Sequence, residues 1–224
     1  TVATIPMQWH HGLPEEDGVF DDRSTAPGAV RLTVAVVAYP RISNLDEFQT
    51  LKNVPGLRLV WARTPADLRA VDWVVLPGSK STVADLAWMR QQGLDAAVCL
   101  HAQRGGAVLG ICGGLQMLGE AIVDPLGVEH RPGMVGGVLG GDAPGLGLLP
   151  LVTSFGEVKT LARSTACFGT LKGPWAGLSG VALSGYEIHQ GQTAQHPAMA
   201  AKGDVACEVL PGLGWQNAAG NVLG

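Results

Sequence analysis

The sequence is organised around one cysteine, which lies where a short apolar run meets a cluster of glycines. Residues Ala107 to Ile111 are apolar, as in a buried strand, and apolar side chains then recur at the spacing of a helix: Leu115, Leu118 and Ile122. Cys112 therefore falls at a strand-to-helix turn. A turn of this kind, called a nucleophile elbow, holds its reactive residue in a strained backbone conformation and needs small neighbours. Three glycines meet that need: Gly110, Gly113 and Gly114.

The elbow points Cys112 at the first turn of the following helix, where unpaired N–H groups and a partial positive charge favour the thiolate. The thiolate is the attacking form of cysteine. The N–H groups of that turn, beginning with Gly113, are placed to hold the oxyanion that forms when the sulfur attacks a carbonyl. Gln116 lies one turn further along the same helix face, and its amide suits a substrate that carries an amide. The alternative is that Cys112 is a structural cysteine in a glycine-rich turn.

A second informative stretch follows the predicted strand Trp73 to Leu76. Because parallel strands end at the same edge of a sheet, Gly78 is expected near Cys112, where its N–H can reach the same oxyanion. The neighbouring Ser79 and Lys80 look superficially like a phosphate-binding loop. The spacing of glycine and lysine does not fit the Walker pattern, so nucleotide binding is not expected at this loop.

Strands and helices alternate over short distances in the first half of the chain. Three apolar runs are predicted as strands: Leu32 to Tyr39, Leu57 to Trp61 and Trp73 to Leu76. Four segments are predicted as helical: Ser43 to Leu51, a short turn from Thr64, Thr82 to Gln92, and Leu94 to Gln103. This alternation predicts an α/β fold with an open, mostly parallel sheet and helices on both faces.

Composition and charge exclude several classes of protein. The length of 224 residues allows one large domain, or one domain with a tail. Residues 1–28 are rich in proline and acidic residues and are predicted to be a linker, with the folded domain at 29–224. The net charge of -4 leaves no basic footprint for nucleic acid, and no apolar run is long enough for a membrane span, which favours a cytoplasmic protein. The cysteines have no metal-ligand spacing, and the three besides Cys112 are expected to fill the core: Cys99, Cys167 and Cys207.

Several motifs, in order, resemble one family. They are Leu76-Pro77-Gly78-Ser79-Lys80, then Gly105-Gly106, then Val108 to Gly119, then Gly145 to Pro150, and finally Gly185-Tyr186-Glu187-Ile188-His189 with Gly191 and Thr193. From Val34 to Gly224 the chain is similar to the glutamine amidotransferase domain of cobyric acid synthase. The set of motifs is far more specific than the cysteine motif, which any class I amidotransferase would share.

The resemblance implies a flavodoxin-like glutaminase that hydrolyses glutamine through a thioester on Cys112. In the family, ammonia passes to an N-terminal synthetase domain, which uses ATP and Mg²⁺ to amidate peripheral carboxylates of a corrinoid, adenosylcobyrinic acid a,c-diamide, in cobalamin biosynthesis. Residues 1–28 would join the two domains. No phosphate loop is present in this chain, so we expect no cofactor or metal in this domain.

The chain departs from the family pattern at two points. Position 115 is leucine where the family usually has an aromatic residue. The histidine that acts as general base in the family follows the Asn-Val-x-Gly segment, so it is expected beyond Gly224, and the domain is expected to be truncated at its C-terminus. His189 is then expected to be a pocket residue or, less in keeping with the motif, a secondary base, and Glu187 to make a structural hydrogen bond.

Other functions remain open from the sequence. A binding or regulatory module can share the fold without catalysis, because fold does not determine function. A cysteine hydrolase or stress-response protein can carry the same elbow. Within the amidotransferases, the alternatives are a cobyrinate a,c-diamide synthase domain and the amidotransferase subunit that acts on lipid II.

Overall fold

The computed structural model describes residues 29–128 and 141–224, and within them the strands form a seven-stranded and a four-stranded sheet. The order of the larger sheet is β2-β1-β3-β4-β11-β10-β9. Its strands are β1 (Leu32–Val37), β2 (Leu57–Ala62), β3 (Trp73–Leu76), β4 (Ala107–Gly110), β9 (Cys207–Leu210), β10 (Gly214–Gln216) and β11 (Val222–Leu223). The five strands from β2 to β11 pair in parallel, and β10 and β9 add antiparallel pairs at one side. The predicted open, mostly parallel sheet is confirmed.

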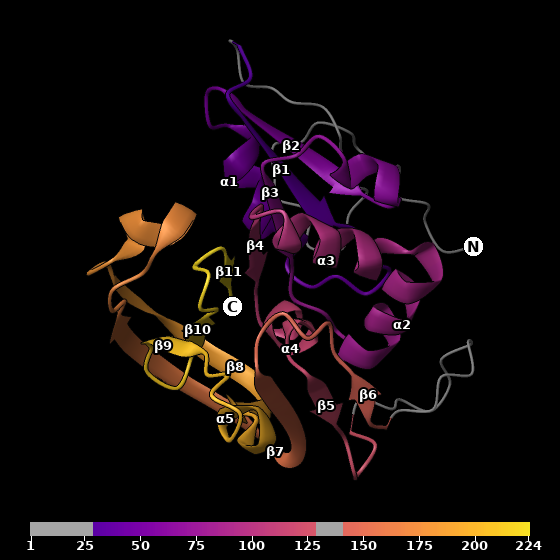
Figure 1. Cartoon of the computed structure of the whole chain (residues 1–224), viewed down its shortest axis with the longest axis vertical. Coiled ribbons are helices and arrows are strands. Elements are labelled where there is room, and N and C mark those ends of the chain that lie inside the picture. The colour runs from indigo at the N-terminus through magenta and orange to yellow at the C-terminus, as the bar shows by residue number, and fades with distance from the viewer. Residues whose placement is uncertain (1–28, 129–140) are drawn as a thin grey trace, which may run out of the picture.

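Helices cover both faces of this sheet. α2 (Thr82–Gln92) and α3 (Leu94–Gln103) have the predicted bounds, and Gly93 separates them in the left-handed conformation. They pack on one face with the short 3-10 helix η2 (Pro65–Leu68), whose N-terminus carries the predicted capping box of Thr64 and Asp67 (Figure 1). On the other face, η1 (Leu45–Phe48) and α1 (Gln49–Lys52) pack against β1 and β2.

The helix predicted from Ser43 to Leu51 begins later than expected. The backbone N–H of Ser43 donates to the carbonyl of Gly78 at 2.9 Å, so Ser43 belongs to a loop that pairs with the segment after β3. A helical residue there would break that pairing. Regular structure starts only at Leu45, two residues further on.

The helix after Cys112 is shorter than the apolar spacing suggested. α4 spans Gly113–Leu118, and Ile122 lies in strand β5 (Ala121–Val123) instead of on the helix. Gly119 ends the helix with extended backbone, and a Cβ there would lie 2.8 Å from the carbonyl oxygen of Leu151. The prediction from periodicity was wrong at Ile122. This residue is buried as part of a strand that follows a sharp turn, and not as part of the helix.

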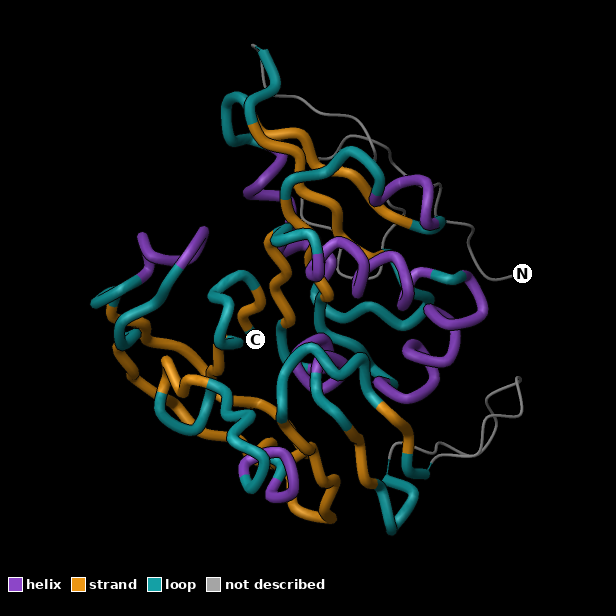
Figure 2. Tube along the Cα trace, in the orientation of Figure 1, coloured by secondary structure: helices purple, strands orange, loops and turns teal. Residues whose placement is uncertain are grey.

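The second sheet has the order β6-β5-β7-β8, with β6 at Ala143–Pro144. Its long strands β7 (Leu151–Cys167) and β8 (Ala182–Gln195) form an antiparallel hairpin that includes η3 (Gly173–Leu178) between them. α5 (Pro197–Ala200) follows. Figure 2 shows the hairpin on the opposite side of β11 from α2 and α3. The hairpin therefore lies on the side of the molecule at which β4 ends.

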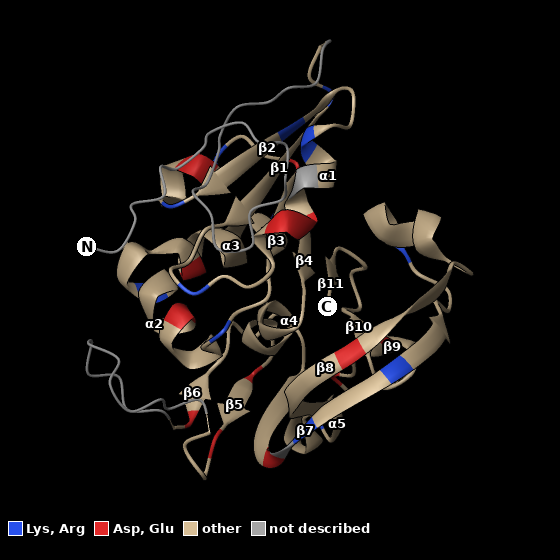
Figure 3. Cartoon of the chain, turned by 180° about the vertical axis from the view of Figure 1, so that it is seen from behind, with Lys and Arg blue, Asp and Glu red and all other residues tan. Residues whose placement is uncertain are grey.

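Acidic and basic residues are interspersed over the elements visible in Figure 3, in keeping with the absence of a basic footprint in the sequence. In the described residues no helix is long and apolar enough to span a membrane. Residues 1–28, predicted to be a linker, lie outside the described part of the chain, so that expectation stays a prediction.

Candidate active site

Cys112 occupies the elbow that the sequence predicts. It has φ 51° and ψ −109°, and Cys112 and Asn44 are the two non-glycine residues with positive φ among those described. Such a conformation is strained for a residue with a Cβ and is held by the surrounding structure. The N–H of Ile111 donates to Leu76 (2.9 Å) and that of Gly114 donates to Ile111 (2.8 Å), which fixes the chain on both sides. The thiol is left exposed at the carboxyl edge of the sheet.

The glycines around Cys112 make the turn possible. A Cβ on Gly114 would lie 1.9 Å from the carbonyl oxygen of Leu76, and a Cβ on Gly110 would lie 2.7 Å from the carbonyl carbon of Gly114. A Cβ on Gly113 would lie 3.0 Å from the backbone nitrogen of Ser79, so the elbow and the loop after β3 touch through this glycine. The requirement for small neighbours, inferred from the sequence, is confirmed.

A cavity of about 560 Å³ opens beside Cys112. Gly78, Gln116 and His189 line it together with Cys112, from four different segments of the chain. Gly113, the residue after Cys112, is buried. In the described part of the chain the backbone N–H groups of Gly78 and Gly113 donate to no protein acceptor. Two unused donors beside an exposed nucleophile are what an oxyanion hole requires.

Gln116 is held by a contact that the sequence analysis did not find. It is 6% exposed, and its Oε1 accepts a hydrogen bond from the hydroxyl of Thr82 at 3.1 Å. Its Nε2 lies beside Gly191, where a Cβ would be only 2.7 Å away. Since Thr82 uses the oxygen of the amide, Gln116 is oriented to donate from its nitrogen. The sequence could have indicated Thr82 as a site residue, because it lies in the first turn of α2, directly after the loop that carries Gly78.

His189 lies on the hairpin wall with both ring nitrogens engaged. Nδ1 is 2.7 Å from the carbonyl oxygen of Gly191, and Nε2 is 2.8 Å from Oε1 of Glu187. Both partners are acceptors, so whichever ring nitrogen carries a proton has an acceptor in front of it. Hydrogen bonds from His189 and Ser164 lower the pKa of Glu187. Glu187 therefore has the structural hydrogen bonding expected of it, and His189 is tied to the hairpin it stands on.

A buried carboxylate, Asp85, supports the loop after β3 and was missed from the sequence. It is fully buried in α2, and its Oδ2 accepts a hydrogen bond from the hydroxyl of Ser79 at 2.6 Å. Its Oδ1 accepts from the backbone N–H of Arg41 at 3.2 Å. Burial raises the pKa of Asp85 to about 6, although the contacts with Ser79 and Arg41 oppose that shift. An acid in the first turn of a helix is usually solvated, so only the tertiary structure reveals this one.

Comparison with known proteins agrees with this geometry. Residues 33–224 match the CobB/CobQ-like glutamine amidotransferase domain. The chain belongs to that family. It is 69% identical over its whole length to cobyric acid synthase of Acidovorax sp. (strain JS42), of which it covers 43%, and 68% identical over its whole length to that of Polaromonas naphthalenivorans (strain CJ2), of which it covers 45%. The amidotransferase chain thus spans less than half the length of these relatives.

Solved structures share the fold at low sequence identity. One described as the structure of PurLQS from Thermotoga maritima aligns with 87% of this amidotransferase and 86% of the other chain, at a TM-score of 0.60 and 17% identity. A second, described as a glutamine amidotransferase, gives a TM-score of 0.57 at 18% identity and covers 85% of this chain and 86% of its own. These matches support the fold class.

The last residue of the amidotransferase chain lies at the active-site edge. β11 pairs in parallel with β4, with Leu223 opposite Leu109, so Gly224 lies beside Gly110. Gly224 and Trp215 exchange two backbone hydrogen bonds, of 2.8 and 2.9 Å, which fix it there. A chain that continues beyond Gly224 would therefore enter the site next to the elbow.

The other cysteines of the amidotransferase lie elsewhere. Cys99 is half-buried on α3, where burial raises the pKa of its thiol. Cys167 and Cys207 are exposed, so the expectation that all three fill the core was wrong. Cys167 ends β7, and Cys207 begins β9, the strand at the edge of the seven-stranded sheet. In the described residues, no group of three or more histidine, cysteine or acidic side chains is arranged to hold a metal ion.

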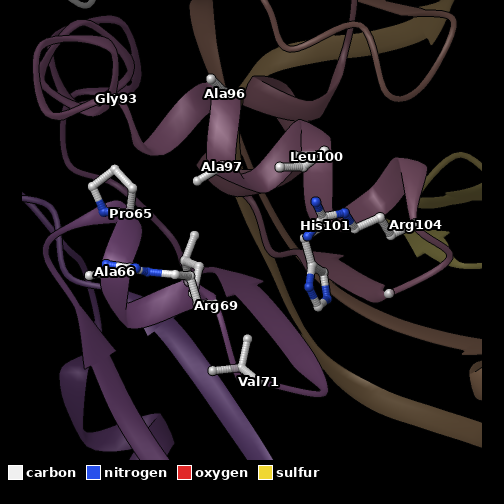
Figure 4. Close-up of a pocket in the computed structure, with 12 residues that line it drawn as sticks. Pro65, Ala66, Arg69, Val71, Gly93, Ala96, Ala97, Leu100, His101 and Arg104 are labelled. Carbon is white, nitrogen blue, oxygen red and sulfur yellow. The ribbon is translucent and has the colours of Figure 1, made fainter.

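A second hollow of about 590 Å³ lies between η2 and α3 (Figure 4). Its lining is mostly apolar, and its titratable side chains are Arg69, His101 and Arg104. Desolvation lowers the pKa of His101, which hydrogen-bonds the carbonyl of Ala107 at 3.2 Å. This hollow has no nucleophile and no carboxylate, so the chemistry of the domain is assigned to the cavity at Cys112.

Proposed function

We propose that this chain is the glutaminase part of a cobyric acid synthase, which releases ammonia from glutamine at Cys112. The observation that carries the proposal is the strained, exposed Cys112 at the edge of a cavity, close to two residues whose N–H groups are unused, Gly78 and Gly113. The high identity to cobyric acid synthases supports the assignment among amidotransferases.

The reaction divides into two steps at the sulfur. The thiolate of Cys112 forms a bond to the carboxamide carbon of glutamine, and the carbonyl electrons move to the oxygen, which the N–H groups of Gly78 and Gly113 stabilise. When the tetrahedral intermediate collapses, the C–N bond breaks and the protonated nitrogen leaves as ammonia, with a thioester left behind. Water then attacks the thioester and releases glutamate. Gln116 donates to the bound glutamine from its amide nitrogen.

The proton transfers need a base, and we place it on a histidine that follows Gly224 in the complete protein. The position of Gly224 beside Gly110 supports this, because a continuing chain enters the site there. His189 is the second candidate, disfavoured because Gly191 and Glu187 occupy its ring nitrogens. General acid–base help is worth about 10² to 10⁴-fold in rate. The 224-residue chain should therefore react at Cys112 but turn over slowly.

That expectation is tested by comparing the present chain with one extended through the histidine. Extension should restore rapid release of ammonia and glutamate, measured with glutamine as substrate. If the 224-residue chain is fully active and His189→Ala abolishes the activity, His189 is the base and this placement is wrong.

The ammonia acceptor belongs to the rest of the protein. We propose a synthetase domain, N-terminal in the same chain and joined through residues 1–28, that uses ATP and Mg²⁺ to activate carboxylates of a corrinoid in the cytoplasm. The support is the length of the relatives, of which this chain covers 43 and 45%. A cobyrinate a,c-diamide synthase or lipid II amidotransferase subunit would use the same glutaminase chemistry with another acceptor.

The experiment is covalent labelling with a glutamine-like electrophile, such as a diazoketone analogue of glutamine, followed by peptide mass spectrometry. Labelling at Cys112 that free glutamine prevents is expected for a glutaminase. A non-catalytic binding module, or a cysteine hydrolase with another substrate, would show labelling that glutamine does not prevent, or no labelling at all.

A further inference from the structure

Asp85 is a carboxylate that the proposed mechanism leaves unused, and it lies directly behind Ser79, which lines the cavity. Its side chain is 0% exposed, and it is bound by groups from two loops. Ser79, in the loop after β3, donates its hydroxyl at 2.6 Å, and Arg41, in the loop after β1, donates its backbone N–H at 3.2 Å and its guanidinium at 3.5 Å. Asp85 therefore joins both loops to helix α2.

The same two loops are also paired with each other. The N–H of Ser43 donates to the carbonyl of Gly78 at 2.9 Å, and the N–H of Lys80 donates to the carbonyl of Arg41 at 2.8 Å. The hydroxyl of Ser79, while it donates to Asp85, accepts from the N–H of Ser81 at 3.0 Å. The loop after β3 is thus held on both sides, with Asp85 at the centre of the bonding.

This loop brings the backbone of Gly78 close to Cys112. A Cβ on Gly78 would lie 2.3 Å from Oγ of Ser43 and 4.0 Å from Cβ of Cys112, so the Gly78 backbone lies between the second loop and the nucleophile. An oxyanion hole works only when its donors are fixed before the charge develops. A small shift of Ser79 moves Gly78 with it, because the two residues share a peptide bond.

Stability alone does not account for a carboxylate at this place. Burying a charge is costly, and a buried ion pair is often no more stable than apolar side chains of the same size. What a carboxylate supplies here is two acceptor oxygens, one for each loop. We propose that Asp85 is a positioning residue that fixes the Gly78 N–H in the oxyanion hole by binding Ser79 and Arg41. The inference rests on the proposed glutaminase function and adds a residue to it.

The test uses the complete protein with two reactions of the same sulfur. Glutamine hydrolysis passes through an oxyanion, whereas alkylation of Cys112 by iodoacetamide is a displacement at a CH₂ carbon and forms none. The variants are Asp85→Asn and Ser79→Ala. Asp85→Asn keeps the shape of the side chain but replaces one of its two acceptor oxygens by an NH₂ group. Asp67→Asn is the matched control, since Asp67 also accepts two backbone N–H groups, of Arg63 (3.0 Å) and Thr64 (2.9 Å), at η2 away from the cavity.

Losing an oxyanion donor lowers kcat by about 10² to 10³-fold, so a displaced donor should lower it by at least about 10-fold. We expect that fall in kcat for Asp85→Asn and Ser79→Ala, with a much smaller change in KM and an unchanged rate of alkylation. The control Asp67→Asn should keep the kcat of the wild type.

Two results would overturn the inference. One is an Asp85→Asn protein with the kcat of the wild type. The other is a parallel fall of kcat and of the alkylation rate, which would mean that Asp85 maintains the elbow itself. A wild-type protein that hydrolyses no glutamine would instead contradict the proposed function, on which the inference rests.

Discussion

Gln116 lies one turn after the nucleophile, with its side chain already oriented by Thr82. Because Thr82 takes up the amide oxygen, we expect a ligand to meet the nitrogen of Gln116. The arrangement spares the bound substrate the cost of orienting this side chain.

We expect Gln116→Ala to weaken the use of glutamine by about 1 to 3 kcal/mol, the cost of leaving a polar group of the substrate buried and unpaired. The change should appear mainly as a higher KM in steady-state glutaminase assays. Thr82→Val, which removes only the orienting hydroxyl, should have a smaller effect in the same direction. Kinetics identical to wild type in Gln116→Ala would remove Gln116 from the site.

Asp85 also predicts a pH dependence of stability. Its pKa is raised to about 6 by burial, whereas in the unfolded chain an aspartate titrates near 4. Between these values the folded state binds more protons at Asp85 than the unfolded state does, so this group makes the free energy of unfolding fall as pH rises from about 4 to about 6. Each unit of pKa difference corresponds to about 1.4 kcal/mol.

The measurement is denaturant unfolding of the wild type and Asp85→Asn between pH 4 and 8. Asp67 and Glu187 have lowered pKa values and act in the opposite sense at lower pH, but they are common to both proteins. The stability of Asp85→Asn relative to wild type should therefore increase up to about pH 6 and then level off. A relative stability that is flat or falls over this range would show that the pKa of Asp85 is not raised in the folded protein.

At the scale of elements, the elbow depends on how closely helix α4 approaches β3. Gly114 is the contact point, because a Cβ there would lie 1.9 Å from the carbonyl oxygen of Leu76 and neither backbone can yield easily. Gly156, on β7, has no atom within 4 Å of its Cβ position and is a matched control.

Gly114→Ala should destabilise the domain by at least about 1 to 3 kcal/mol, the usual cost of overpacking, and should lower the reactivity of Cys112. Gly156→Ala should change neither. Thermal unfolding and alkylation rates of the two variants test this. A stable Gly114→Ala protein with wild-type alkylation would mean that α4 can move away from β3 without loss of the elbow.

The sequence was most informative where local pattern and tertiary structure agree. β1, β2 and β3 are apolar runs separated by turns, as expected of strands buried on both faces, and Cys112 was placed correctly because glycines mark the elbow. The helix after Cys112 was predicted too long. Ile122 is as apolar as a buried helical residue, and only the turn at Gly119 separates it from the helix.

The hairpin of β7 and β8 had a weaker signal. Both faces of the hairpin are partly exposed, and Leu161 and Tyr186 are 72% and 73% exposed. Its sequence therefore lacks the alternation of apolar and polar residues that is typical of a strand with one buried face. Its pairing, and with it the contact of Glu187 with Ser164 on β7, depends on a register between distant segments. Asp85 and Thr82 were missed for the same reason, since their partners lie in other elements.

At the scale of the whole molecule, the domain is one half of a proposed enzyme in which glutamine is split at one site and ammonia is used at another. The nucleophile, the cavity and the edge at Gly224 all face the carboxyl ends of β3, β4 and β11. In the proposed reaction, ammonia is therefore released at this edge of the domain. A synthetase half that accepts free ammonia would bypass this side altogether.

The most direct test of the central claim is the Cys112→Ser variant of the complete protein, assayed with glutamine and with ammonium salts. A serine hydroxyl is far less acidic than a thiol, so glutamine hydrolysis and covalent labelling should be abolished, while amidation with ammonium should persist at the level of the wild type. Glutaminase activity retained in Cys112→Ser would contradict the account, and loss of the ammonium-dependent reaction as well would mean that Cys112 has a structural role.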